Sequence, residues 1–223
     1  MQLTNTRPSV TAAIAITVAS LTIGMTTPTS ATPAAHHPTV RVVVRPVTAS
    51  GHAVPGYTVT QSHYAISCSP AAPSPVSISR NVETCSPSAA YAVACWKAAK
   101  RKHALCLPNP RQKKLRLEPL TGKFAATAAV PARTRSPFAV VLSDGATCNI
   151  RIGGTGGILT SHPNFYATYY CTSGDAIWAK GNAAHSGVNE AHATWQVRTA
   201  SGAGGNAKLV TRQVRRAYFV ATA

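Results

Sequence analysis

Carboxylates are scarce in this chain, and they limit the chemistry it could perform. Among 223 residues there are five acids, Glu83, Glu118, Asp144, Asp175 and Glu190. Asp144 and Asp175 each stand close to a serine, so a Ser-His-Asp set would form if folding brought a histidine beside them. Two carboxyl groups could also flank a glycosidic bond. Any hydrolytic site must be built from this short set.

Three histidines of the C-terminal part could complete such a set: His162, His185 and His192. Neither the G-x-S-x-G nor the H-E-x-x-H motif is present. Asp144-Gly145 and Ser173-Gly174-Asp175 read as turns, where Asp commonly bonds its own backbone. The sequence therefore predicts turn-forming aspartates, no catalytic residue, no metal and no cofactor. A secreted hydrolase with an unrecognised site in the C-terminal part is the alternative.

Basic side chains give the strongest physical signal. Lys and Arg number 22, which gives a formal charge of +17. Such a field attracts anions, and we expect anionic lipid or glycan surfaces as partners. Solubility alone also explains a high net charge, and no known nucleic-acid-binding module is present. The candidate anion-binding residues form three clusters, which are Lys97, Lys100, Arg101 and Lys102; Arg111, Lys113, Lys114 and Arg116; and Arg212, Arg215 and Arg216.

An export signal is expected at the N-terminus. Arg7 precedes an apolar stretch over residues 10–23, and small residues follow it. This order is typical of a secretory signal peptide, which we assign to residues 1–35, with cleavage after Ala31 or Ala35. No later stretch is long and apolar enough to span a membrane. The mature chain is therefore expected to be extracytoplasmic, and its charge suggests association with the cell envelope.

Six cysteines follow the signal, and an even number in an exported chain predicts disulfides. Cys148 and Cys171 lie on two expected strands, and we pair them. Cys85 and Cys95 flank most of an expected helix, which would hold them about 15 Å apart, too far for a bridge. Without a bridge between Cys85 and Cys95, two arrangements of the first four cysteines stay open. One pairs Cys68 with Cys95 and Cys85 with Cys106, and the other pairs Cys68 with Cys85 and Cys95 with Cys106.

The elements that must position these residues suggest an α+β fold of two modules. Residues 36–120 form a small strand-plus-helix module, residues 121–137 an Ala- and Pro-rich linker, and residues 138–223 a β-rich module. The helix is expected over residues 86–102, because Ser86 and Pro87 suit its start, alanines fill it and cations end it. We expect N-terminal strands over residues 39–47 and 57–68 and an edge strand over 111–120. The C-terminal strands are expected over residues 138–142, 147–152, 165–171, 176–180, 192–199 and 208–220.

Several short stretches together resemble a known group of proteins. They read CSPSAAYAVACW over residues 85–96, LSDGATC over 142–148, YYC over 169–171, WQVR over 195–198 and AYFV over 217–220. With them, residues 40–223 resemble secreted proteins of mycobacteria and related actinobacteria that have no assigned activity. This resemblance implies export and a disulfide-stapled fold, and it implies no substrate.

A second resemblance covers residues 39–106 alone. Two strands that end in Ile66-Ser67-Cys68-Ser69-Pro70, followed by a helix with Ala94-Cys95, are similar to the front half of Streptomyces subtilisin-inhibitor-type proteins. The resemblance implies the pairing of Cys68 with Cys95 and of Cys85 with Cys106, and it makes protease inhibition a third hypothesis. Our main hypothesis is an exported, non-enzymatic, basic protein that associates electrostatically with anionic envelope or host surfaces.

Overall fold

The chain divides by its internal contacts into two units, Met1–Ala35 and His36–Ala223. Our computed structural model describes residues 37–87, 92–152, 157–181, 186–201 and 207–223. All of them belong to the second unit, and everything below concerns that unit. The expected signal peptide and its cleavage points lie outside the described residues.

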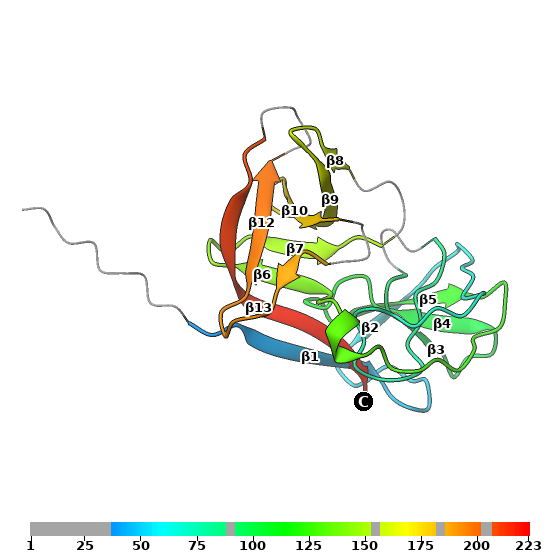
Figure 1. The fold of residues 1–223 in the computed structure, drawn as a ribbon. Helices are drawn as coiled ribbons and strands as arrows, with labels where there is room; N and C mark the ends of the chain where they lie inside the picture. Colours follow the sequence, from blue (N-terminus) through cyan, green and yellow to red (C-terminus); the bar gives the residue numbers. More distant parts are fainter. Residues whose placement is uncertain (1–36, 88–91, 153–156, 182–185, 202–206) are drawn as a thin grey trace, which may run out of the picture. The chain divides into compact units, whose positions relative to one another are not determined.

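The described residues fold almost entirely as β-structure (Figure 1). A single 3-10 turn, η1, is the one helical element among them. No helix with the length and apolarity of a membrane span occurs in the described ranges. The elements are β1 Val40–Val47, β2 Thr58–Gln61, β3 Cys95–Lys97, β4 His103–Cys106, β5 Lys114–Pro119, η1 Ala132–Thr134, β6 Ala139–Leu142, β7 Thr147–Ile150, β8 Ile158–Leu159, β9 His162–Cys171, β10 Asp175–Lys180, β11 Val188–Asn189, β12 Gln196–Ser201 and β13 Val210–Thr222.

Six strands close into an antiparallel barrel in the order β6-β7-β9-β10-β12-β13. The long strand β13 closes it, because its first residues pair with β12 and its middle pairs with β6. Tight turns join β6 to β7 and β9 to β10, and Gly145 and Gly174 adopt the positive φ that these turns need. Every C-terminal strand expected from the sequence is present, although several begin or end a few residues away from the expected bounds.

The second sheet has four strands in the order β2-β5-β4-β3. Strand β5 therefore lies between β2 and β4, so the expectation of an edge strand over residues 111–120 was wrong. The second expected strand, over residues 57–68, is reduced to the four residues of β2. Basic and apolar residues alternate along β5, from Lys114 to Leu117. The strand can lie inside the sheet because Leu115, on its apolar face, is fully buried in the core.

The helix expected over residues 86–102 is not formed, and the α+β assignment was wrong. Residues 88–91 lie outside the described part. Of the other residues of the segment, Cys95–Lys97 form β3, and residues 99–102 form bends and a turn. Five consecutive residues from Ala92 to Trp96 are buried, a pattern that a one-sided helix cannot satisfy and a strand buried on both faces can. Cys95 exchanges two backbone hydrogen bonds with Glu83, each 2.9 Å long, and it pairs with Cys106 on its other side. Alanine helix propensity, under about 1 kcal/mol per residue, does not outweigh this pairing.

One apolar core joins the two sheets. Trp96, Leu105 and Leu115 from the four-stranded sheet pack in the same cluster as Phe138 and Val220 from the barrel side. In addition, β1 pairs in parallel with β13, so the N-terminal segment supplies a strand to the C-terminal sheet. The barrel sheet therefore includes a strand from before the segment over residues 121–137, whereas all four strands of the second sheet precede that segment.

All six cysteines are in disulfides, as the even count predicted. Cys148 bonds Cys171, which confirms the pair expected from two strands. The other two bridges are Cys68–Cys85 and Cys95–Cys106. The pairing implied by the inhibitor resemblance was therefore wrong, and the other open arrangement is the one formed. Cys95 and Cys106 are direct neighbours across β3 and β4, in strands that replace the helix expected around Cys95.

Gly51 supports the β3–β4 hairpin through a close backbone approach. Its φ is +82°, and a Cβ there would lie 2.5 Å from the Lys97 carbonyl oxygen and 2.6 Å from the Ala99 nitrogen. We expect Gly51→Ala to lower the free energy of unfolding by more than about 2 kcal/mol, because left-handed backbone strain adds to the displacement of two backbone groups. Gly145→Ala is the matched control, since φ is +88° there but no atom lies within 4 Å of an added Cβ. Urea unfolding of both variants measures the difference, and equal losses would contradict the steric argument.

Candidate functional site: a cationic pocket on the barrel

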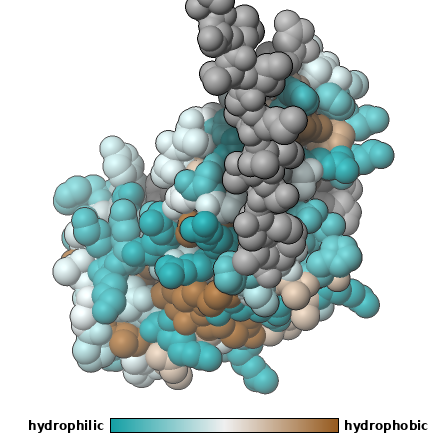
Figure 2. Space-filling view, turned by 90° about the vertical axis from the view of Figure 1, so that its left-hand side faces the viewer, coloured by the Kyte–Doolittle hydropathy of each residue, from teal (hydrophilic) through white to brown (hydrophobic). Residues whose placement is uncertain are grey.

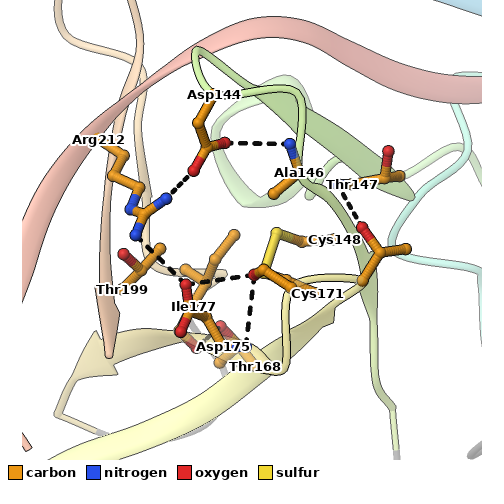
Figure 3. Close-up of a disulfide and its surroundings, with 12 residues drawn as sticks. Asp144, Ala146, Thr147, Cys148, Thr168, Cys171, Asp175, Ile177, Thr199 and Arg212 are labelled. Carbon is orange, nitrogen blue, oxygen red and sulfur yellow. Dashed lines mark hydrogen bonds and ion pairs between the residues drawn. A yellow bond between two sulfur atoms is a disulfide. The ribbon is translucent and has the colours of Figure 1, made fainter. Parts of the chain in front are cut away.

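Asp144 and Asp175, the aspartates considered for hydrolysis, are both bound to one arginine. Arg212 of β13 forms an ion pair with Asp144, and its Nη2 lies 3.3 Å from Asp175 Oδ2. Asp144 also accepts a 3.0 Å hydrogen bond from the Ala146 N–H, which is the turn role that the sequence predicted. Figure 3 shows the three charged side chains meeting beside the Cys148–Cys171 bridge. This cluster ties two hairpin turns to β13, and both candidate carboxylates share the single positive charge of Arg212.

The expected histidine partners do not join these aspartates in the described part of the chain. His162 hydrogen-bonds Ser161 at 3.0 Å and contacts the edge of the Phe165 ring. His192 is exposed, and His185 lies outside the described residues. The described residues therefore contain no Ser-His-Asp arrangement built on Asp144 or Asp175.

The three basic clusters expected from the sequence do not merge. Lys97, Lys100, Arg101 and Lys102 are exposed around the β3–β4 hairpin. Arg111, Lys113 and Lys114 are exposed near the start of β5. Because His103 pairs with Pro119 at the far end of β5, these two clusters lie at opposite ends of the sheet, about 16 Å apart along the strand. Arg116 is bound to Glu118, Arg212 to the two aspartates, and only Arg215 and Arg216 of the third cluster are exposed on β13.

A pocket of about 850 Å3 brings together cations that the sequence leaves far apart. Its walls come from the η1 segment, from β9 and β10, from β11 and the residue after it, and from β12 and β13. Phe165 and Trp178 form an aromatic part of the lining, and the Arg198 guanidinium carbon lies 5.5 Å from the Phe165 ring centre. Among the described lining residues, Glu190 is the one acid, and the bases are Arg133, Arg135, Lys180 and Arg198.

The Glu190 end of this pocket has an unbalanced positive field. Glu190 Oε2 lies 2.8 Å from Arg41 Nη2, so its charge is already shared with an arginine of β1. Burial first, and then the positive charge of Arg41, lower the pKa of Arg135, while Glu190 raises it. Burial raises the pKa of Glu190, and Arg41 and Arg135 oppose that rise. One carboxylate thus faces two guanidinium groups, and a bound anion would lower the electrostatic energy of this end of the pocket.

Arg135 itself is only partly satisfied by protein groups. Its Nη2 donates to the Val130 carbonyl at 2.7 Å, whereas its Nε is buried without a hydrogen-bond partner. Buried polar groups without partners are rare in folded proteins, and each one calls for an explanation. The fixed guanidinium is therefore held in place by backbone while part of its donor capacity is left unused.

Glu83 is the most unusual ionisable group outside the pocket. Its side chain is fully buried, and neither carboxylate oxygen has a well-formed hydrogen bond. Burial raises the pKa of Glu83 to about 7, and a backbone contact from Ala125 opposes the rise. One of its carboxylate oxygens lies within 4.8 Å of the sulfurs of Cys68 and Cys85. Those sulfurs are bonded to each other, so this trio offers no thiolate to a metal ion.

Sequence reasoning missed the pocket because its bases are scattered. Lys180 and Arg198 are isolated basic residues in strands, and Arg133 and Arg135 fall in the segment that we interpreted as a linker. The Arg-x-Arg sequence of Arg133 and Arg135, between Pro131 and Pro137, is the local signal that could have drawn attention to it. No family model, no curated protein and no solved structure matches the chain, so the resemblances to actinobacterial exported proteins and to subtilisin inhibitors stay predictions.

Proposed function

We propose that this protein is an exported, non-enzymatic binding protein of the cell envelope, and that the pocket lined by Arg133, Arg135, Lys180 and Arg198 holds an anionic group of its ligand. One observation carries the proposal: the described residues that line a pocket of about 850 Å3 include four cations and one carboxylate, which is already paired. Pockets of about 300–1,000 Å3 are the usual size for small-molecule sites. N-terminal sequencing of the protein recovered outside the cell checks the export.

Phosphate and sulfate groups suit this lining best. Arginine presents planar pairs of donors that match the oxygens of phosphate or sulfate, and lysine adds a point charge. Ser136, Ser186 and Thr211 contribute hydroxyl groups to the same walls. The shared ligand chemistry is therefore a phosphorylated or sulfated group, borne either by a lipid head group or by a soluble molecule.

The hydrolase alternative gains no support from the pocket. Neither Asp144 nor Asp175 is among its described lining residues, and both are bound to Arg212. The single acid there, Glu190, lacks the second carboxyl group that glycoside hydrolysis commonly uses. Binding without catalysis is the simpler use of such a lining.

Charge reversal at two pocket residues tests the proposal. In the Lys180→Glu/Arg198→Glu variant we expect binding of tripolyphosphate, measured by calorimetry, to weaken at least about tenfold, because a charge-assisted hydrogen bond contributes roughly 1.5–3 kcal/mol. Binding by the unmodified chain should also weaken as salt rises from low to physiological concentration. Sedimentation with phosphatidylglycerol vesicles, run in parallel, distinguishes a lipid head group from a soluble anion.

A matched variant separates the pocket from the general positive charge. Lys100→Glu/Arg101→Glu changes the net charge by the same amount on the exposed β3–β4 hairpin. It should retain tripolyphosphate binding within about twofold, since neither residue lines the pocket and salt screens the charges of exposed side chains. Equal losses in both variants would instead assign binding to diffuse surface charge, and no binding by the unmodified chain at low salt would overturn the proposal.

A further inference from the structure

β1 leaves one of its edges unpaired along most of its length. Among the described strands it pairs with β13 alone, and it stands at the end of the strand order of its sheet. An isolated bridge joins its last residue, Val47, to Ala53. Backbone bonds occupy the two ends, since the Thr39 N–H donates to Ala193 and the Pro46 carbonyl accepts from Val54. The edge between them, residues 40–45, is about 20 Å long. Such an edge offers a row of backbone donors and acceptors to another extended chain.

Apolar side chains accompany this free edge. Val40 is 55% exposed and Val43 is 39% exposed, while Val42 and Val44 are half-buried. Figure 2 views the side of the molecule on which β1, β12 and β13 lie in Figure 1, and it shows an apolar patch surrounded by hydrophilic residues. A partner strand would cover part of the exposed surface of Val40 and Val43 while it completes the backbone pairing.

The charges on β1 determine which strand can be that partner. Side chains alternate along a strand, so Arg41, Val43 and Arg45 share one face and the other valines share the opposite face. Arg41 packs over the Trp195 ring at 4.7 Å and pairs with Glu190, whereas Arg45 bonds only the Thr222 carbonyl, at 3.0 Å, among the contacts described. Arg45 in particular keeps an unneutralised charge beside the edge.

A second copy of the chain is a poor occupant. Two antiparallel β1 strands that match their faces about Val43 place Arg41 opposite Arg45, and like charges directly opposite each other destabilise a pair. A shift of one residue moves every side chain to the other face and brings the arginines against valines. An acidic strand has neither problem.

We infer that β1 is a docking edge for an extended acidic segment of another protein, with carboxylates opposite Arg41 and Arg45 and β-branched residues between them. This inference is independent of anion binding in the pocket. The complementary pattern is Glu-Val-Val-Val-Glu, which reads the same in both directions and so fits a parallel or an antiparallel partner.

Peptide binding to the full chain tests this inference. The probe is a fluorescent peptide with Glu-Val-Val-Val-Glu between Gly-Ser tails, and fluorescence anisotropy reports its affinity. A peptide with Lys in place of both Glu residues should bind at least about tenfold more weakly, because two cross-strand pairs change from attraction to repulsion. Arg45→Glu should reduce the preference for the acidic peptide, while Arg101→Glu, with the same change of charge on the exposed hairpin, should leave it within about twofold.

Backbone methylation distinguishes strand pairing from simple charge attraction. Alternate residues of a docked strand point their N–H groups toward β1 and away from it. We therefore compare two N-methylated acidic peptides. The peptide methylated on the residues whose N–H groups point toward β1 should lose binding, and the peptide methylated on the residues in between should keep it. Equal binding by both, or by the acidic and basic peptides, would overturn the inference. So would a dimer in analytical ultracentrifugation that the acidic peptide dissociates, because that result assigns the edge to a second copy.

Discussion

Arg116→Met is expected to lower the free energy of unfolding by about 3 kcal/mol, because it leaves Glu118 as an uncompensated buried charge. The Glu118 side chain is fully buried, and its Oε1 lies 2.8 Å from Arg116 Nε. No well-aligned hydrogen bond reaches either Glu118 oxygen, so the attraction between opposite charges is its main compensation. Arg116 also donates a 3.0 Å hydrogen bond to Ser62, which the variant loses as well.

A double variant separates the buried charge from lost packing. Arg116→Met/Glu118→Met replaces the pair by two apolar side chains and should recover most of the loss, since buried ion pairs are often no more stable than apolar substitutes. Lys114→Met, at an exposed position of the same strand, should change the free energy of unfolding by less than about 0.5 kcal/mol. Urea unfolding of the oxidised proteins gives all three values. If the double variant is as unstable as Arg116→Met, the buried charge is not the cause.

Glu83→Gln is expected to stabilise the protein at pH 8 by about 3 kcal/mol relative to the unmodified chain. Burial raises the pKa of Glu83 from an ordinary value of 4.5 to about 7. Between these two values the folded state keeps a proton that the unfolded state has lost. The free energy of unfolding therefore falls as pH rises through this window, by about 1.4 kcal/mol for each pH unit, and this loss is complete above pH 7. Gln cannot ionise, so the variant lacks this part of the pH dependence.

The measurement is the difference between the two unfolding free energies across pH 4 to 8. The difference should be small near pH 4, where Glu83 is protonated in both states, and it should grow steadily up to pH 7. Glu83→Met, which has no acceptor oxygens, should show the same loss of slope and so separates ionisation from hydrogen bonding. Parallel curves for the unmodified chain and Glu83→Gln would mean that Glu83 ionises in the folded protein much as it does in the unfolded one.

Local patterns predicted the barrel strands well. The alternation in β9 and β10, together with Ser173-Gly174-Asp175 between them, specifies a hairpin that needs no distant partner. The same holds for β6 and β7 about Asp144-Gly145. Cys148 of β7 lies directly opposite Cys171 of β9. That disulfide could be assigned from the sequence because these two cysteines are the only ones in the C-terminal part and both lie on expected strands.

The segment from Ala92 to Lys97 shows where local patterns fail. Its alanines favour a helix when considered alone, but its neighbours are Glu83 on one side and Cys106 on the other. A helix expected over this segment gives no reason to look for strand partners at Glu83 and Cys106. In the structure these two residues supply backbone hydrogen bonds on both sides of Cys95, and Cys106 also forms its disulfide. Tertiary pairing outweighs a weak intrinsic preference here. It also places Cys95 opposite Cys106, whereas the resemblance to subtilisin inhibitors implied a bond from Cys95 to Cys68.

The sequence by itself determined the positive charge, the even set of cysteines and the strands that are joined by short turns, because these depend on composition or on residues close together in the chain. Only the tertiary structure decided which charges are free. Arg116 and Arg212 belong to sequence clusters but are bound to acids, while Lys180 and Arg198 are isolated in the sequence and meet in one pocket. The physical reason is that a charge acts on whatever lies within a few ångströms of it, and strand pairing between distant segments sets those neighbours.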